Sequence, residues 1–163
     1  METRTKSPVI NSIFSANEGK VPQNTEFSFS FNPEEIIRKY EKGTAPLAAR
    51  IAAVKTLISR GYKVGLRFLP LLPVANYENL YRKLLKNLRA EIDFSKISSV
   101  FIASLIYNPG DFKQMQKKNP NSDLWSLVQQ DSGLVKIDQP VWEHFLQIFA
   151  EELPGVKLYF DYI

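Results

Sequence analysis

The chain has 163 residues, of which 44% are hydrophobic and 23% charged, so it can bury one sizeable core and is too apolar to be disordered throughout. Its formal charge of +4 permits contact with nucleic-acid phosphates without indicating it. Cysteine is absent and histidine occurs once, which excludes disulfides, cysteine-ligated zinc, an iron–sulfur cluster held by these residues and a multi-histidine metal site.

No apolar run approaches the roughly 20 residues that span a bilayer, and the first residues are polar rather than signal-like. We therefore expect an intracellular, cytoplasmic protein that has no membrane partner.

The first predicted strand lies in METRTKS, where Glu2, Arg4 and Lys6 would share one face. Alternating charges are typical of a solvated edge strand, and they also suit an inward-facing ionic cluster that binds a zwitterionic ligand; the pattern leaves both open. Because most domains begin with a frayed polar lead, a strand this early suggests a chain cut from a longer one.

The most regular pattern is TEFSFSF, in which Phe27, Phe29 and Phe31 alternate with Ser28 and Ser30. This period of two predicts a strand that has one aromatic face and one hydroxyl face. The hydroxyl face is either exposed to solvent or turned toward a polar ligand, and alternation alone does not distinguish the two.

Helix signals follow this strand. Asn32 is expected to cap a helix over residues 33–41, which opens with Pro33. Thr44 is expected to cap a second helix, whose apolar stripe begins at Leu47 and which Gly61 ends.

The later pattern predicts, in order, a strand at 62–70, a helix at 76–91, a strand at 97–107, helices at 111–118 and 123–130, a turn at 131–133, a short strand at 134–137, a helix at 139–152 and a strand at 156–162. The run at 97–107 is the most apolar and is predicted to be a fully buried strand. His144 falls off the apolar face of its helix and is predicted to be exposed to solvent.

Strands separated by helix-length connections predict parallel βαβ units with right-handed crossovers. In such sheets ligands bind at the carboxyl ends of the strands, here residues 6–7, 30–32, 68–70 and 104–107. The chain has no GxGxxG, GxxxxGK[ST] or GxSxG motif, so no motif supports a nucleotide-binding fold or a hydrolase.

Three segments, in this order, resemble the carboxyl-terminal half of the spore photoproduct lyase family of radical S-adenosylmethionine proteins. They are ETRTKS, the run from FSFNPEEIIRKYEKGT to GYKVGLRFLPLLP, and GLVKIDQPVWEHFLQIFAEELPGVKLYFDY. The resemblance implies a single domain over residues 1–163, built as half of a partial (β/α) TIM barrel whose helices lie outside the parallel strands. Residues 119–163 would form a subregion with a hairpin, a helix and the last strand.

The resemblance also implies that S-adenosylmethionine lies across the strand ends. Lys6 would bind the methionyl carboxylate, and Ser30 would hydrogen-bond the same amino-acid moiety. Leu69, which precedes a proline, would contact the cofactor by its backbone or by packing. Glu2 and Arg4 are weaker candidates that would support Lys6.

The family holds a [4Fe–4S] cluster on a CxxxCxxC motif in its amino-terminal half, where a further cysteine donates a hydrogen atom. This chain has no cysteine and no predicted catalytic residue, so we expect it to be inactive in DNA photolesion repair unless a missing amino-terminal half supplies the cluster. Its predicted hairpin turn reads QQDSG and lacks the aromatic and arginine pair that the lyases carry there.

A second hypothesis is a non-catalytic α/β module that binds a partner or nucleic acid. Half a barrel leaves two open sheet edges, which an amino-terminal half or a second copy of the chain would cover. DNA is a partner by resemblance only.

Overall fold

The computed structural model describes residues 1–7, 9–16 and 20–161. Its main sheet has five strands, all parallel, in the spatial order β1-β2-β3-β4-β8. These are β1 Glu2–Thr5, β2 Glu26–Ser30, β3 Lys63–Leu71, β4 Ile97–Ser104 and β8 Leu158–Asp161. The predicted α/β half-barrel of parallel strands is confirmed. The last strand was expected to reach residue 162, which lies outside the described residues.

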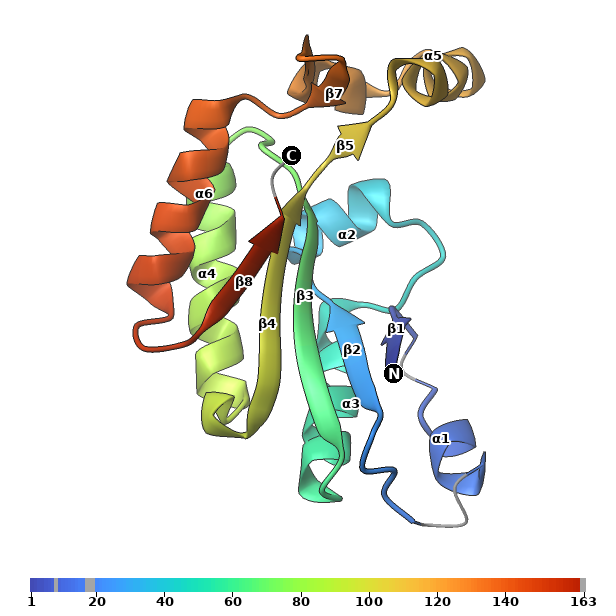
Figure 1. Ribbon diagram of the computed structural model, residues 1–163, viewed down its shortest axis with the longest axis vertical. Helices are drawn as coiled ribbons and strands as arrows, with labels where there is room; N and C mark the ends of the chain where they lie inside the picture. The colour runs from blue at the N-terminus through green and yellow to red at the C-terminus, as the bar shows by residue number, and fades with distance from the viewer. Residues whose placement is uncertain (8, 17–19, 162–163) are drawn as a thin grey trace.

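The helices connect these strands, and Figure 1 shows α3, α4 and α6 on one side of the sheet. Their bounds are α1 Asn11–Ala16, α2 Glu34–Tyr40, α3 Leu47–Ser59, α4 Tyr77–Glu91, α5 Pro109–Lys118 and α6 Gln139–Glu152. Within the described ranges, no helix is both long and apolar enough to cross a membrane.

A small antiparallel sheet lies beyond the carboxyl end of β4 (Figure 1). It consists of β5 Ile106–Tyr107, β6 Gln129–Asp131 and β7 Leu134–Lys136. β6 and β7 form a hairpin whose turn residues, Ser132 and Gly133, both have positive φ. The prediction of a helix over 123–130 is wrong in part, because a 3-10 helix at Asp123–Leu127 gives way to β6.

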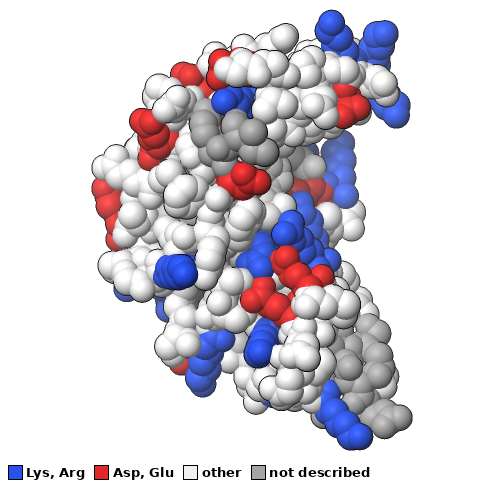
Figure 2. Space-filling view, in the orientation of Figure 1, with Lys and Arg blue, Asp and Glu red and all other residues white. Residues whose placement is uncertain are grey.

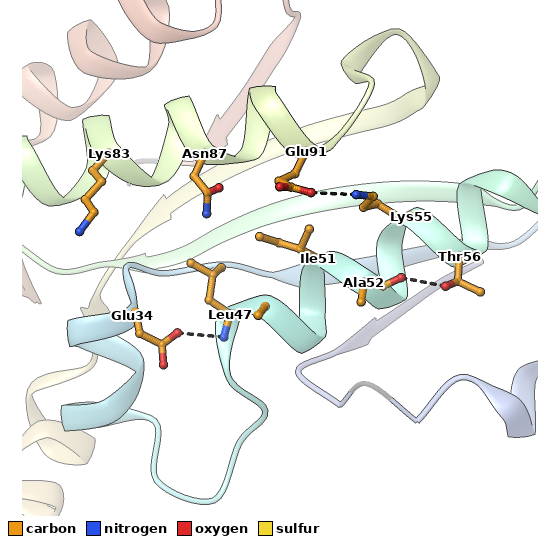
Figure 3. Close-up of a pocket in the computed structure, with 10 residues that line it drawn as sticks. Glu34, Leu47, Ile51, Ala52, Lys55, Thr56, Lys83, Asn87 and Glu91 are labelled. Atoms are coloured by element: carbon orange, nitrogen blue, oxygen red, sulfur yellow. Dashed lines mark hydrogen bonds and ion pairs between the residues drawn. The ribbon is translucent and has the colours of Figure 1, made fainter.

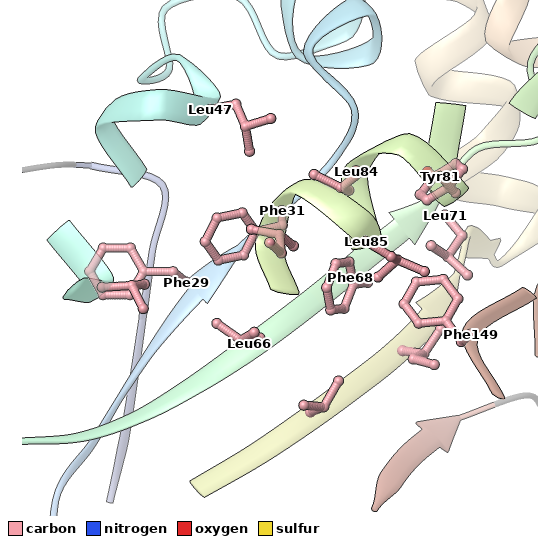
Figure 4. Packing of buried hydrophobic residues seen from close by; sticks show 14 of the residues in the cluster. Phe29, Phe31, Leu47, Leu66, Phe68, Leu71, Tyr81, Leu84, Leu85 and Phe149 are labelled. Carbon is pink, nitrogen blue, oxygen red and sulfur yellow. The ribbon is translucent and has the colours of Figure 1, made fainter. Parts of the chain in front are cut away.

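The core lies between the sheet and the helices, and the aromatic face of β2 is at its centre (Figure 4). Phe29 and Phe31 are wholly buried there. On the next strand, Phe68 meets Phe149 of α6 edge to face, with ring centroids 4.8 Å apart. Successive strand residues point to opposite faces, so the same alternation that buries the phenylalanines places polar residues on the other face.

Both helix caps expected from the sequence are wrong. Neither α2 nor α3 has a side-chain cap, and prolines 33 and 46 occupy the N-cap positions. A carboxylate oxygen of Glu34, in α2, accepts the Leu47 N–H at 3.0 Å and so satisfies a free donor of α3. Asn32 and Thr44 bind other side chains instead, as described below.

Two burial predictions also need correction. β4 is buried on one face, where Val100 and Ile102 point to the helices, while Phe101 on its other face is only half-buried. The apolar run predicted burial on both faces, but in the described structure no helix layer covers the open face of the half-barrel. His144 is part-buried rather than fully exposed, and its Nδ1 lies 2.7 Å from the Tyr77 hydroxyl.

Candidate functional site

The carboxyl ends of β1, β2 and β3 meet at one edge of the sheet, which is where parallel α/β folds bind ligands. Three predicted site residues lie at these ends. Lys6 follows β1 directly, Ser30 is the last residue of β2, and Leu69 lies near the end of β3.

Glu41, in the connection between α2 and α3, binds the side chains that converge at this edge. One carboxylate oxygen accepts from the Lys6 ammonium at 3.0 Å and from the Asn32 amide at 2.9 Å. The other forms an ion pair with Arg50 at 2.6 Å. Burial raises the pKa of Glu41, but hydrogen bonds from Asn32, Arg50 and Lys6 outweigh it, so the pKa lies below its ordinary value and the carboxylate stays ionised.

Arg50, in the first turn of α3, is wholly buried, and its guanidinium joins several backbone and side-chain groups. It donates to the Ser30 carbonyl at 2.9 Å, to the Ala45 carbonyl at 2.9 Å and to the Thr44 hydroxyl at 2.7 Å. Because it also binds Glu41, one buried ion pair connects the Lys6 side chain to the Ser30 backbone.

Asn32 extends these contacts to the third strand. The Tyr81 hydroxyl donates to the Asn32 side-chain oxygen at 2.8 Å and accepts the Leu72 N–H at 3.0 Å. Tyr81 is wholly buried in α4, and burial raises its pKa, so the hydroxyl stays protonated. The strand-end network, as we call Lys6, Asn32, Glu41, Arg50 and Tyr81, therefore connects the ends of all three strands.

A second polar cluster lies nearer the amino-terminal ends of β1 and β2, on the face of the sheet opposite the helices. Arg67 of β3 donates to Glu2 at 2.7 Å, to the Ser99 hydroxyl at 2.8 Å and to Glu26. Figure 2 shows basic and acidic atoms side by side over β1–β3 in this region. Gly65 leaves the space that this inner-face cluster occupies, because a Cβ there would lie 2.5 Å from a Glu26 carboxylate oxygen.

Glu2 and Arg4 belong to this inner-face cluster rather than to the strand-end network. Arg4 forms two hydrogen bonds to the Glu2 carboxylate, at 3.0 and 3.1 Å, and its guanidinium lies 6.0 Å from the centroid of the Phe101 ring. Lys6 does not join them, because β1 ends at Thr5 and the lysine turns toward Glu41.

The Arg4 hydrogen bonds, aided by those from Ser28 and Arg67 and opposed by burial, lower the pKa of Glu2 to about 2. A folded-state pKa below the unfolded value of about 4.3 stabilises the fold above that pH, and this contribution is lost as pH falls toward 2. We therefore expect the melting temperature of the unmodified chain to exceed that of Glu2→Gln at pH 7 and the difference to vanish by about pH 2. Thermal unfolding from pH 7 to pH 2 measures this; a difference that stays constant with pH would contradict it.

The hydroxyl face of β2 is buried. Ser28 is inaccessible and donates to Glu26 at 3.0 Å, while Ser30 is 5% exposed. An exposed face, one of the two alternatives from the sequence, is therefore wrong. Ser28 belongs to the inner-face cluster. Ser30, the last residue of β2, is the serine nearest the strand ends.

Sequence reasoning missed Glu41, Arg50, Tyr81 and Arg67 as site or supporting residues. One signal was present: Arg50 falls within the helical spacing of Leu47, Ile51 and Val54, so a charge was bound to be buried with that stripe. A charge on an apolar stripe needs a partner, but spacing does not say which one.

A groove of about 710 Å³ lies elsewhere, between α3 and α4 (Figure 3). Leu47 and Ile51 line it on one side, and Lys83 and Asn87 on the other. A 2.7 Å ion pair between Lys55 and Glu91 lies at one end. None of the residues that line this groove belongs to the strand-end network.

Across residues 1–7, 9–16 and 20–161, no group of three or more His, Asp or Glu side chains is arranged to hold a metal ion.

Comparison with known proteins gives one family. The family model described as spore photoproduct lyase matches residues 3–124. The spore photoproduct lyase of Bacillus subtilis (strain 168) is 35% identical over 68 residues, which are 42% of this chain and 20% of that protein.

Solved spore photoproduct lyase structures have the same fold. A variant with dinucleoside spore photoproduct superimposes with a TM-score of 0.77 at 20% identity, covering 98% of this chain and 51% of the other. A variant with bound AdoMet and dinucleoside spore photoproduct gives 0.73 at 18% identity, covering 99% and 50%. The chain thus spans about half the length of the structures it matches.

Proposed function

The chain belongs to the spore photoproduct lyase family, and on that premise we propose that it forms the carboxyl-terminal, S-adenosylmethionine-binding half of a radical S-adenosylmethionine protein of DNA photolesion repair. The observation that carries this proposal is the convergence of Lys6 and Ser30 at the carboxyl edge of a parallel sheet, joined through Glu41 and Arg50. The AdoMet-bound relative that shares the fold supports the choice of cofactor.

The strand-end residues suit the amino-acid moiety of this cofactor. Lys6 is one-third exposed and forms an ion pair with Glu41. An ammonium group has three hydrogens to donate, so that of Lys6 can also donate to a ligand carboxylate. Ser30 would offer its hydroxyl at the end of β2, and Leu69 offers a half-buried apolar surface near the end of β3. Glu2 pairs with Arg4 of the same strand and with Arg67 of β3, so the two residues would support the site by holding β1 in the sheet.

The residues present do not fit an iron–sulfur cluster, because the 163 residues contain no cysteine. We propose that an amino-terminal half supplies the cluster and the strands that complete the barrel, and that this chain is inactive in repair without it. The half-length coverage of the solved structures supports this division. Bound S-adenosylmethionine would supply the radical chemistry once reduced.

DNA is the proposed substrate class, since solved relatives hold a dinucleoside photoproduct.

The alternative, a module that only binds a partner, is favoured by one observation. β8 lies at an edge of the described sheet, and its Tyr159 and Phe160 are 45% and 57% exposed. Exposed aromatic side chains on an edge strand suit pairing with another chain. Light scattering at high concentration that shows only monomer would count against a second copy as this partner.

Isothermal titration with S-adenosylmethionine tests the proposed function. We expect measurable binding by the unmodified chain, and Lys6→Ala and Ser30→Ala to weaken it by about 10- to 100-fold and about 3- to 10-fold, the losses expected for charged and neutral hydrogen bonds. Lys55→Ala removes an exposed lysine outside the strand-end network, so it is the matched control and should bind normally. No binding by the unmodified chain, or normal binding by Lys6→Ala, would overturn the proposal.

A further inference from the structure

We propose that Glu41 and Arg50 are positioning residues for the cofactor's amino-acid moiety, holding Lys6 and Ser30 in the geometry that receives it. This inference rests on the proposed function. It adds two residues that would act through others and would not touch the cofactor themselves.

The burial of the pair is the first argument. The Glu41 side chain is 7% exposed and that of Arg50 is inaccessible, at 2.6 Å from each other. Removing two charges from water is costly, and a buried ion pair is often no better for stability than apolar residues of similar volume. A role in placing other groups explains the arrangement better than stabilisation alone.

The identity of their partners is the second argument. Glu41 binds the Lys6 ammonium, and Arg50 binds the Ser30 carbonyl, so the two proposed cofactor contacts are fixed relative to each other. Asn32, which Glu41 also binds, connects through Tyr81 to the Leu72 N–H just beyond β3. Three strand ends that are distant in sequence are thereby held as one unit.

The physical effect is preorganisation. A lysine side chain loses conformational entropy when it is ordered, and Glu41 orders the Lys6 side chain before any ligand arrives. Arg50 offsets the charge of Glu41, so Lys6, Glu41 and Arg50 together keep a charge of +1 toward an incoming carboxylate.

The test is Glu41→Asp, which keeps the charge and withdraws the carboxylate from Lys6 by one methylene. Titrations compare S-adenosylmethionine with 5′-methylthioadenosine, which lacks the amino-acid moiety. We expect a five- to tenfold loss of affinity for the first and a change of less than twofold for the second. Equal losses for both ligands would indicate a merely structural role and overturn the inference.

Arg50→Lys is the second variant, because lysine keeps the charge but cannot reach Glu41 and the Ser30 carbonyl together. It should reproduce the selective loss. Both variants can also be tested without ligand. In each of them, an amine-selective reagent should label Lys6 severalfold faster than in the unmodified chain, while the labelling rate of Lys55 stays unchanged.

The two proposals fail differently. If Lys6→Ala binds S-adenosylmethionine normally, the proposed function fails. If Lys6→Ala weakens binding but Glu41→Asp changes neither the selectivity nor the labelling of Lys6, only the positioning role fails.

Discussion

Replacement of Arg50 by methionine is expected to lower the free energy of unfolding by about 3–5 kcal/mol, the usual cost of removing one partner of a buried ion pair. Methionine fills much of the same volume, so the loss reports on the polar contacts rather than on a cavity. The Glu41 carboxylate would lose its nearest cation and stay buried, and the carbonyls of Ser30 and Ala45 would lose a donor.

Urea unfolding followed by circular dichroism measures this change. Lys55→Met is the matched control, because Lys55 also pairs with a glutamate at 2.7 Å but is half-exposed. Exposed ion pairs contribute about 0–1 kcal/mol, so the control should unfold almost normally. A loss below 1 kcal/mol for the Arg50 variant would mean that the buried network does not hold the strand ends.

Gly65→Ala is expected to destabilise the chain by about 2–4 kcal/mol, more than a methyl group costs in an ordinary strand, because it overpacks a buried polar cluster. The new Cβ would lie 2.5 Å from a Glu26 oxygen, 2.7 Å from an Arg67 nitrogen and 2.7 Å from the Ser28 hydroxyl. All three are side-chain atoms, and they belong to residues that are hydrogen-bonded to one another. Moving them to make room for the methyl group therefore disturbs the hydrogen bonds that the Glu26 oxygen accepts from Arg67 and Ser28.

Gly110→Ala provides the matched control for the Gly65 variant. Gly110 lies in the first turn of α5 with open space where its Cβ would be, so alanine should be neutral or stabilising by up to about 1 kcal/mol. Differential scanning calorimetry of the two variants measures the contrast. Equal melting temperatures would show that the inner-face cluster can rearrange at little cost.

Local patterns in the sequence predict most of the order of the elements and the resemblance to the family. Local patterns carry that information: the alternation of Phe27, Phe29 and Phe31 needs only a pleated strand, and helix-length connections between strands leave parallel pairing as the simple solution. The sequence also placed Lys6 and Ser30 at strand ends, since the end of a strand is a property of the chain nearby.

The partners of those residues depend on contacts between distant parts of the chain, which appear only in the folded structure. Arg67 meets Glu2 across 65 positions, and Tyr81 meets Asn32 across 49, separations that no local pattern encodes. The same contacts explain the failed cap at Asn32: its amide donates to Glu41 and its oxygen accepts from Tyr81, and a buried polar group takes the partners that the fold brings to it. Lys6 likewise leaves the face of Glu2 and Arg4 because β1 ends before it and a buried carboxylate lies within reach.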